Sequence, residues 1–259
     1  MNERCKYIGK LMKINDLKQY LTEILQPDSF DDYCPNGLQV EGKLEIGKIV
    51  TGVTASQALI DAAVEVDADA IIVHHGYFWK GESQPIVGMK KRRIKTILDH
   101  DINLFAYHLP LDAHAEFGNN VMLGKALDLS ISHWIGNNNM LAVSVLKQAI
   151  RLKDLSDIVS LKLNRVPQVI GADEKLINTI AWCTGAAQGY IEKSIAENID
   201  VFISGEISEQ TVHAVRESNT AYIAAGHHAT ERYGVSALGE HLSQKFGLLH
   251  QFIDINNPV

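Results

Sequence analysis

The order of apolar and polar residues along the chain predicts an α/β protein. Short runs of β-branched residues at 48–53 and 69–73 are typical of buried strands, and residues 56–66 between them have the apolar spacing of a helix. A strand, a helix and a strand in this order form a βαβ unit, whose two strands lie parallel. The second strand runs into His74 and His75. Because ligands bind beyond the carboxyl ends of strands in open α/β sheets, these histidines lie where a site is expected.

The two adjacent histidines can share one site only under a local condition. Neighbouring side chains on a strand point to opposite faces, so the strand must stop at His74 and the backbone must turn. Gly76 permits that turn. The alternative is a polar strand end whose histidines cap backbone groups. Deciding between a functional site and a capped strand end requires further residues with suitable side chains that lie at the same place.

The residues before this unit predict a helix and then a turn-rich loop. Apolar residues recur at helical spacing over 14–25, where Asn15 or Asp16 is the expected cap and Pro27 the expected end. Residues 31–36 form a loop that enters a short strand. The acids of this loop could reach a metal ion, but we favour a solvated loop.

The residues after the histidines carry aromatic and basic side chains. The loop over 77–83 contains three aromatic residues, which form either a wall beside the site or part of the core. The basic run at 90–93 begins a helix and is typical of a solvated face, with phosphate binding by Arg92 or Arg93 as the alternative. The remaining expectations are a buried stripe of Ile94, Ile97 and Leu98 on that helix, strands over 102–106 and 166–170, and helices over 119–127 and 152–163.

The second half of the chain repeats the apolar pattern of the first. The pattern recurs without a gap 131 residues later, and a His-x-x-x-acid motif follows a later strand in both halves. We infer two pseudo-repeated, intertwined α/β halves with mixed sheets, residues 1–128 and 129–259, with an approximate boundary between them. Both halves direct strand carboxyl ends at a common site between them. The paired positions are Ile49 with Ile180 and His75 with Glu206 at the first offset, and His108 with His227 and Asp112 with Glu231 at an offset of 119.

Histidines and acids beyond the strands form a candidate set of metal ligands. Imidazole nitrogen and carboxylate oxygen suit Zn, Fe, Mn or Ni, and the motifs contain no nearby thiolate, which argues against a structural zinc site of the cysteine type. Three nitrogens and two carboxylates exceed what one tetrahedral ion needs. With one carboxylate as a bridge, they can hold two divalent ions roughly 3.5–4 Å apart. The five candidate ligands are His74, His75, Asp112, His227 and Glu231.

Composition and charge narrow the class of protein. The net charge of -7 argues against a surface built mainly to bind nucleic acid or an anionic membrane. Cys5, Cys34 and Cys183 form no CxxC pair, so no disulfide framework is expected. The chain has no apolar run long enough to span a bilayer and no apolar leader. These features predict a cytoplasmic protein.

Several motifs together resemble one known family. They are Pro-Asn-Gly-Leu-Gln-Val at 35–40, Val-Thr-Gly-Val-Thr at 50–54, His-His-Gly at 74–76, His-Leu-Pro-Leu-Asp at 108–112, Gly-Asn-Asn at 118–120, Ser-Gly-Glu at 204–206 and Gly-His-His-Ala-Thr-Glu at 226–231. The sequence is similar to the short bacterial form of the GTP cyclohydrolase type-2 homolog family, also called the NGG-interacting-factor-three-like dinuclear metal proteins. The resemblance covers nearly the whole chain.

The resemblance implies a fold, a site and an activity. It implies a duplicated α/β fold assembled as a hexameric ring, and a two-metal centre that uses the five ligands above with Glu231 as the bridge. His108 and Glu206 lie beside these ligands in the motifs. They are candidate catalytic residues that orient the ligands or transfer protons. The family name implies the opening of a guanine ring by water.

Three functions agree with these features. The first is a two-metal hydrolase whose small-molecule substrate is a purine nucleotide or another compound with a hydrolysable C–N bond. The second is a non-enzymatic metal-binding or regulatory ring, which would take up metal tightly without hydrolysis. The third is a ring linked to nucleic-acid metabolism or repair, for which the basic run at 90–93 is the only sequence support. We take the hydrolase as the working hypothesis.

Overall fold

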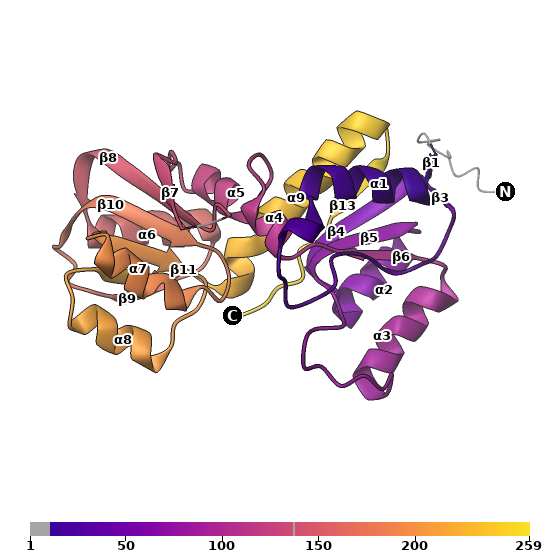
Figure 1. Ribbon diagram of the computed structural model, residues 1–259, viewed down its shortest axis with the longest axis horizontal. Coiled ribbons are helices and arrows are strands. Elements are labelled where there is room, and N and C mark those ends of the chain that lie inside the picture. The colour runs from indigo at the N-terminus through magenta and orange to yellow at the C-terminus, as the bar shows by residue number, and fades with distance from the viewer. Residues whose placement is uncertain (1–10, 137) are drawn as a thin grey trace. The chain divides into compact units, whose positions relative to one another are not determined.

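The βαβ unit expected near the start of the chain is present in the structure, a computed structural model that describes residues 11–136 and 138–259. Strand β4 (Lys48–Thr54), helix α2 (Gln57–Glu65) and strand β5 (Ala70–His75) follow one another (Figure 1). The two strands pair in parallel, as predicted.

Two compact units divide the chain. The first takes residues up to Leu111 together with Val235–Ile255, and the second takes Asp112–Gly234 with Asn256–Val259. Helices α4 (Leu109–Ala113) and α9 (His227–Phe246) each continue from one unit into the other. Each unit contains one main mixed sheet with helices, which confirms the α/β class.

A sheet of five strands forms the first unit. All its strands are parallel except β2, which pairs antiparallel with β6 at the edge. In spatial order the strands are β13 (Leu249–Phe252), β4, β5, β6 (Asn103–Ala106) and β2 (Gly37–Val40). The other elements of this unit are a ribbon of β1 (Met12–Lys13) and β3 (Glu45–Ile46), helices α1 (Ile14–Leu25) and α3 (Gly88–Asp99), and a 3-10 turn, η1 (Pro27–Ser29).

Helices cover both faces of this sheet. On one face the strand residues Val50, Ile71 and Leu104 pack in one buried cluster with Leu59 of α2 and Ile97 of α3. Helix α1 lies on the opposite side of the sheet from α2 and α3 (Figure 1). Burial on both faces is what the near-continuous apolar runs of these strands require.

Helix α1 has the bounds that its apolar spacing predicts, but its cap differs. The residue before it is Lys13 in extended conformation, and no side chain caps the helix. The expectation that Asn15 or Asp16 caps it is wrong, because both residues lie within its first turn. The helix ends where Gln26 adopts a left-handed conformation (φ 46°), directly before Pro27.

Helix α3 buries two of its three expected apolar residues. Ile94 and Ile97 are buried, whereas Leu98 is 54% exposed, so the expected place of Leu98 in the stripe is wrong. The position after Ile97 is rotated by about 100° around the helix axis, which carries Leu98 away from the core.

A sheet of six strands forms the second unit. Its central strands β10, β11 and β12 are parallel, and the others pair antiparallel. In spatial order the strands are β7 (His133–Ile135), β8 (Leu141–Arg151), β10 (Leu176–Cys183), β11 (Val201–Ser204), β12 (Ala221–Ala224) and β9 (Gln168–Ile170). Its other elements are helices α5 (Asn119–Ala126), α6 (Leu152–Leu163), α7 (Ile191–Ala196) and α8 (Glu209–Arg216), and the 3-10 turn η2 (Gln188–Tyr190).

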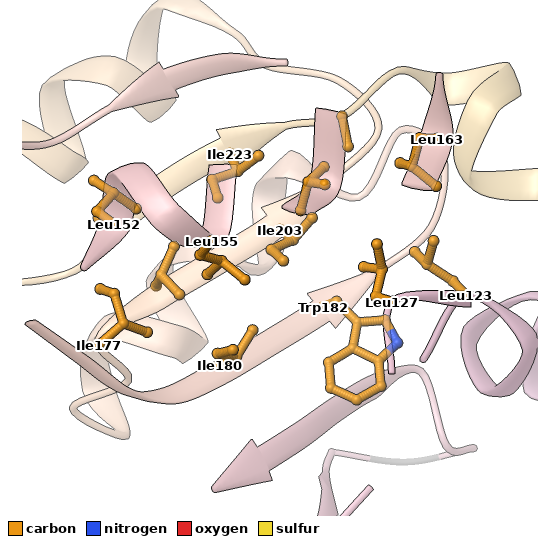
Figure 2. Packing of buried hydrophobic residues seen from close by; sticks show 14 of the residues in the cluster. Leu123, Leu127, Leu152, Leu155, Leu163, Ile177, Ile180, Trp182, Ile203 and Ile223 are labelled. Atoms are coloured by element: carbon orange, nitrogen blue, oxygen red, sulfur yellow. The ribbon is translucent and has the colours of Figure 1, made fainter. Parts of the chain in front are cut away.

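Figure 2 shows the larger core of the second unit. Leu155 of α6 and Leu127 pack in one cluster with the strand residues Ile203 and Trp182. The indole Nε1 of Trp182 donates a hydrogen bond to the carbonyl oxygen of Asn120 (2.8 Å), so the buried ring leaves no polar atom unsatisfied. The opposite face of this sheet packs against α7 and α8.

The two sheets share one strand order and one register. The order β13-β4-β5-β6-β2 in the first unit matches β8-β10-β11-β12-β9 in the second, except that β13 pairs in parallel with β4 whereas β8 pairs antiparallel with β10. Ile49 pairs with Ala70, and the residues 131 positions later, Ile180 and Val201, pair in the same way. The internal offset in the sequence therefore corresponds to the same hydrogen-bond ladder built twice.

An aspartate occupies the equivalent position in the two sheets and accepts hydrogen bonds from equivalent backbone amides. Asp69 Oδ2 accepts hydrogen bonds from the backbone amides of Gly47 (2.8 Å) and Lys48 (2.9 Å). Asp200 Oδ2 accepts from the amides 131 positions after those, Asn178 and Thr179, both at 2.8 Å. Burial alone would raise the pKa of Asp200, but these hydrogen bonds lower it.

None of the helices in the described ranges is long and apolar enough to cross a membrane. Cys34 and Cys183 are buried free thiols, and Cys5 lies outside the described residues.

Candidate metal centre

The adjacent histidines share one site although the strand continues past the first of them. Strand β5 runs through His75, which pairs with Thr54, so the condition that the strand stop at His74 is wrong. Side chains at a strand end can lean along the strand direction. The two imidazole centroids lie 4.5 Å apart, and the His108 ring lies 5.0 Å from His74 and 5.8 Å from His75. One ring nitrogen from each of the three falls within 4.8 Å of the others.

Gly76 is needed for space and not for an unusual φ. A Cβ atom at this position would lie 2.2 Å from Gln39 Oε1 and 2.5 Å from the Cβ of Ala106. Gln39 Oε1 accepts a hydrogen bond from the Tyr77 amide (2.7 Å), which fixes the chain directly after the histidines.

Hydrogen bonds select the tautomers of the cluster. His74 Nδ1 lies 3.0 Å from the carbonyl oxygen of Tyr107, which can only accept, so neutral His74 carries its proton on Nδ1. His108 Nδ1 lies 2.7 Å from Asp32 Oδ1, and the same argument applies. The lone pair of each ring is then on Nε2, which is the form that binds a metal ion.

Asp32 belongs to this site, and the sequence analysis missed it. Its loop was expected to be solvated, but Asp32 is only 8% exposed. Its Oδ1 accepts from His108 Nδ1 and its Oδ2 from Asn36 Nδ2 and the Leu109 amide, both at 2.9 Å. Burial would raise the pKa of Asp32, but hydrogen bonds from His108 and Asn36 lower it to about 2.

Cys34 lies beside these groups but is poorly suited to bind metal. It forms a compact group with Asp32 and His108. Burial and the charge of Asp32 raise the pKa of the Cys34 thiol to about 12, and only a thiolate binds metal strongly. Both oxygens of Asp32 are already hydrogen-bonded, so this group orients His108 instead of forming a second metal site.

The second unit carries the acidic candidates. Asp112 is buried, and its Oδ1 accepts from Asn119 Nδ2 at 2.9 Å and from the Thr184 hydroxyl at 3.4 Å. One carboxylate oxygen of Asp112 and one of Glu231 lie within 4.8 Å of each other. Oxygens at this spacing are suited to one hard or borderline cation.

His227 joins the two acidic residues of this unit. Its Nε2 lies 3.1 Å from Glu231 Oε2, and its Nδ1 lies 2.6 Å from Glu206 Oε1. The two acids thus contact opposite ring nitrogens, and Glu206 orients the ring as expected of a residue beside a ligand. Burial would lower the pKa of His227, but hydrogen bonds and charge from Glu231 and Glu206 raise it to about 9. The two carboxylates therefore favour a positive charge between them, at the position of the His227 ring.

One extra residue precedes His227 in comparison with the first unit. The Tyr107 amide donates to the Val73 carbonyl and the Ala225 amide to the Ser204 carbonyl, so the strands correspond at an offset of 118. His108 and His227 correspond at 119. The inserted residue is Gly226, whose φ of 102° favours glycine.

Gly185 gives the Glu231 carboxylate its space. Its φ is 66°, and a Cβ atom would lie 2.0 Å from Glu231 Oε1. Its amide donates to Thr230 Oγ1 (3.0 Å), which holds the loop close to the first turns of α9.

We expect Gly185→Ala to destabilise the protein by roughly 1–3 kcal/mol, because it combines a clash with a left-handed conformation. Metal affinity should fall as well, since Glu231 must move. Urea unfolding and metal titration measure both effects. Gly189→Ala in η2 is the matched control, because a Cβ there meets no atom within 4 Å. Equal stability and metal affinity for the two variants would contradict the assigned role of Gly185.

The structure therefore brings the candidate residues together in two sets. The first unit gathers His74, His75 and His108, with Asp32 as the residue that was missed. The second unit gathers the other four candidates: Asp112, Glu206, His227 and Glu231.

Comparisons with a family profile and with known proteins agree on one family. The profile of the family described as Duf34/NIF3 (NGG1p interacting factor 3) matches residues 12–258. A protein of Pseudomonas aeruginosa named GTP cyclohydrolase 1 type 2 homolog is 50% identical over 249 residues, 95% of this chain and 98% of that protein. A Vibrio cholerae protein of the same name is 51% identical over 247 residues, 94% of this chain and 98% of that protein.

Solved structures agree with this likeness. The structural-genomics protein ybgI, of unknown function, has a TM-score of 0.91 at 47% identity and covers 96% of this chain and 100% of its own. A crystal structure of a Thermus thermophilus protein has a TM-score of 0.86 at 35% identity, with coverage of 96% and 100%.

Proposed function

Because the chain belongs to the Duf34/NIF3 family, we propose that it is a hydrolase that depends on a dinuclear metal centre. His74, His75, Asp112, His227 and Glu231 would hold two divalent ions, drawn from Zn, Fe, Mn or Ni, with Glu231 as the bridge. The supporting observation is that each unit holds a compact ligand set oriented by further hydrogen bonds: histidine nitrogens in the first, and Asp112, His227 and Glu231 in the second. The donor set fits borderline divalent cations.

Divalent ions at such a site supply Lewis acidity and lower the pKa of water towards neutral. The residues of the chain carry the other roles. Asp32 holds the His108 proton on Nδ1, and Glu206 holds that of His227, so that both rings keep a fixed orientation. His108 and Glu206 are the proposed proton-transfer groups, and the partly exposed side chain of Glu206 can exchange protons with solvent.

The proposed substrate is a purine nucleotide, in which water would open the ring at a C–N bond. The support is the name GTP cyclohydrolase 1 type 2 homolog, carried by relatives at about half identity over nearly the whole chain. The test is a screen of metal-reconstituted protein against nucleotides and cyclic amides, followed by detection of ring-opened product. Metal-dependent turnover in the wild type, absent from Glu231→Gln, is expected. Tight metal uptake without any hydrolysis would replace the enzyme with a metal-binding or regulatory protein.

The metal count is a direct prediction of this proposal. Protein stripped with a chelator and reloaded should bind about two ions per chain, as a two-metal site requires. Elemental analysis after gel filtration measures the ratio. Saturation at one ion per chain would contradict the dinuclear centre while leaving a mononuclear site possible.

Two further properties are part of the proposal. The first is a hexameric ring, which the family resemblance implies. The second is a cytoplasmic location, which fits two buried free thiols at Cys34 and Cys183. A role in binding nucleic acid is not part of it, because the net charge is -7.

A further inference from the structure

We propose that Tyr33 and Trp79 form a stacking site for a planar nitrogen heterocycle of the purine class, beside the histidine cluster of the first unit. The choice of a purine rests on the proposed function. The aromatic site itself rests on the geometry of the first unit.

The two rings lie around the same imidazole. The Trp79 ring meets His108 edge to face, with centroids 5.0 Å apart and planes at 80°. Its centroid is also 5.9 Å from His75. The Tyr33 ring approaches His108 at 6.3 Å and 64°. Both aromatic rings therefore lie near His108, the proposed proton-transfer group, and a planar ligand that contacts them would be bound in its vicinity.

Tyr33 exposes its ring on a fixed backbone. The residue is 61% exposed, although a large aromatic side chain gains most from burial. Its amide donates to Asp32 Oδ1 and its carbonyl oxygen accepts from the Lys80 amide, both at 2.6 Å. An exposed aromatic residue whose backbone is already fixed loses little conformational entropy when a ligand stacks on it.

The polar atoms of Trp79 form hydrogen bonds within its own loop. Its indole Nε1 donates to the Gly76 carbonyl (3.2 Å), its amide donates to Glu82 Oε2 (3.1 Å), and its carbonyl accepts from the Glu82 amide (2.9 Å). The indole N–H is thereby used within the loop. Trp79 is partly exposed, and with its indole N–H already used, the contact it can offer a ligand is stacking and not hydrogen bonding.

The other aromatics of the loop have different places. Tyr77 is 5% exposed, and its hydroxyl donates to the Ala55 carbonyl (2.8 Å), so it belongs to the core. Phe78 packs edge to face on Tyr77 and lies under the Lys90 ammonium at 4.9 Å. Tyr77 thus has the place that the core interpretation predicts, whereas Trp79 lies beside the histidines.

Stacking on exposed aromatic side chains is the usual way in which proteins hold a nucleobase without reading its edges. Such a site would orient the ring of a purine beside the histidines without fixing which purine is bound. It would act on substrate affinity and placement and leave metal binding unchanged.

The test measures binding of guanosine to protein stripped of metal, by isothermal titration calorimetry. Tyr33→Ala should weaken binding roughly 5- to 150-fold, the range that loss of one base-stacking aromatic produces. Tyr33→Phe keeps the ring and should restore affinity to within about threefold of the wild type. Phe78→Ala, in the same pair of loops, is the matched control and should bind like the wild type. Inorganic triphosphate, which has no base, should show no dependence on Tyr33.

The outcomes separate this site from the proposed activity. Equal guanosine affinity in the wild type and Tyr33→Ala, or no guanosine binding by the wild type, would overturn the stacking site. Metal-dependent hydrolysis with a KM unchanged by Tyr33→Ala would also overturn it, and the hydrolase would stand. Binding that depends on Tyr33 without turnover of any substrate would keep the stacking site and remove the hydrolase.

Discussion

Asp32→Asn should lower the free energy of unfolding at pH 7 by roughly 3 kcal/mol, because a carboxylate that accepts hydrogen bonds on both oxygens is replaced by an amide that accepts on one. The donors around it, His108 Nδ1, Asn36 Nδ2 and the Leu109 amide, cannot all be satisfied after the change. Urea unfolding followed by circular dichroism measures the effect. Asp31→Asn is the matched control, because the neighbouring Asp31 side chain is 97% exposed.

The same substitution has a defined pH dependence. Folding lowers the pKa of Asp32 from 3.8 to about 2, so its charge stabilises the folded protein fully above pH 4. That contribution, about 2 kcal/mol, disappears as the pH falls from 4 towards 2. The stability difference between the wild type and Asp32→Asn should shrink over this interval. A difference that stays constant from pH 6 to pH 2.5 would show that Asp32 is not the buried anion described here.

Glu231→Gln should lower metal affinity by more than about 100-fold, since even the outer partners of metal ligands contribute roughly 10- to 100-fold. The amide keeps the shape of the side chain but removes the charge that a bridge between two cations requires. Without metal, the stability should fall by only about 1 kcal/mol, because the amide oxygen of glutamine can still accept the hydrogen bond from His227 Nε2 that Glu231 Oε2 now accepts (3.1 Å). Metal titration and thermal unfolding measure the two effects separately.

Asp16→Asn provides the comparison for this substitution. Asp16 lies in the first turn of α1 and belongs to neither ligand set, whereas Glu231 lies just past the first turn of α9. It should leave metal binding intact. If Glu231→Gln still binds two ions and turns substrate over at the native rate, Glu231 is not the bridge and the ligand assignment must change.

The sequence predicts the elements whose apolar residues face one continuous core. Helices α1 and α6 have the bounds expected from apolar spacing alone, 14–25 and 152–163, because each buries one stripe along its length. Strand β8 was not predicted because its burial is not periodic: its first four residues are buried and none of the remaining seven is. Leu98 was wrongly expected to be buried, because the buried stripe of α3 is narrower than the apolar residues of this helix suggest.

The sequence predicts where the histidines of the site lie better than it predicts which residues hydrogen-bond to them and orient them. The histidines lie at or just beyond strand ends, where ligands of α/β sheets gather, and their motifs are recognisable. Asp31 and Asp32 look equivalent in the sequence, yet one side chain is 97% exposed and the other 3%. The difference comes from donors at positions 36, 108 and 109, and the last is 77 residues away. Such long-range partners leave no local pattern.

The sheet of the first unit is completed by a strand from the far end of the chain. Strand β13 pairs with β4, and Leu249 lies opposite Lys48. During synthesis on the ribosome, β4 therefore emerges long before its outer neighbour exists. The strands of the second unit all lie between His133 and Ala224, so that sheet has all its strands earlier.

Proteins with several domains usually fold from the amino terminus during synthesis. In this chain the second sheet is the first to have all its strands, and β4 of the first sheet has no outer neighbour until β13 has been made. An unpaired strand edge invites pairing with other chains. We therefore expect the outer side of β4 to be open to such pairing until β13 covers it, after which β13 is the edge strand on that side of the sheet.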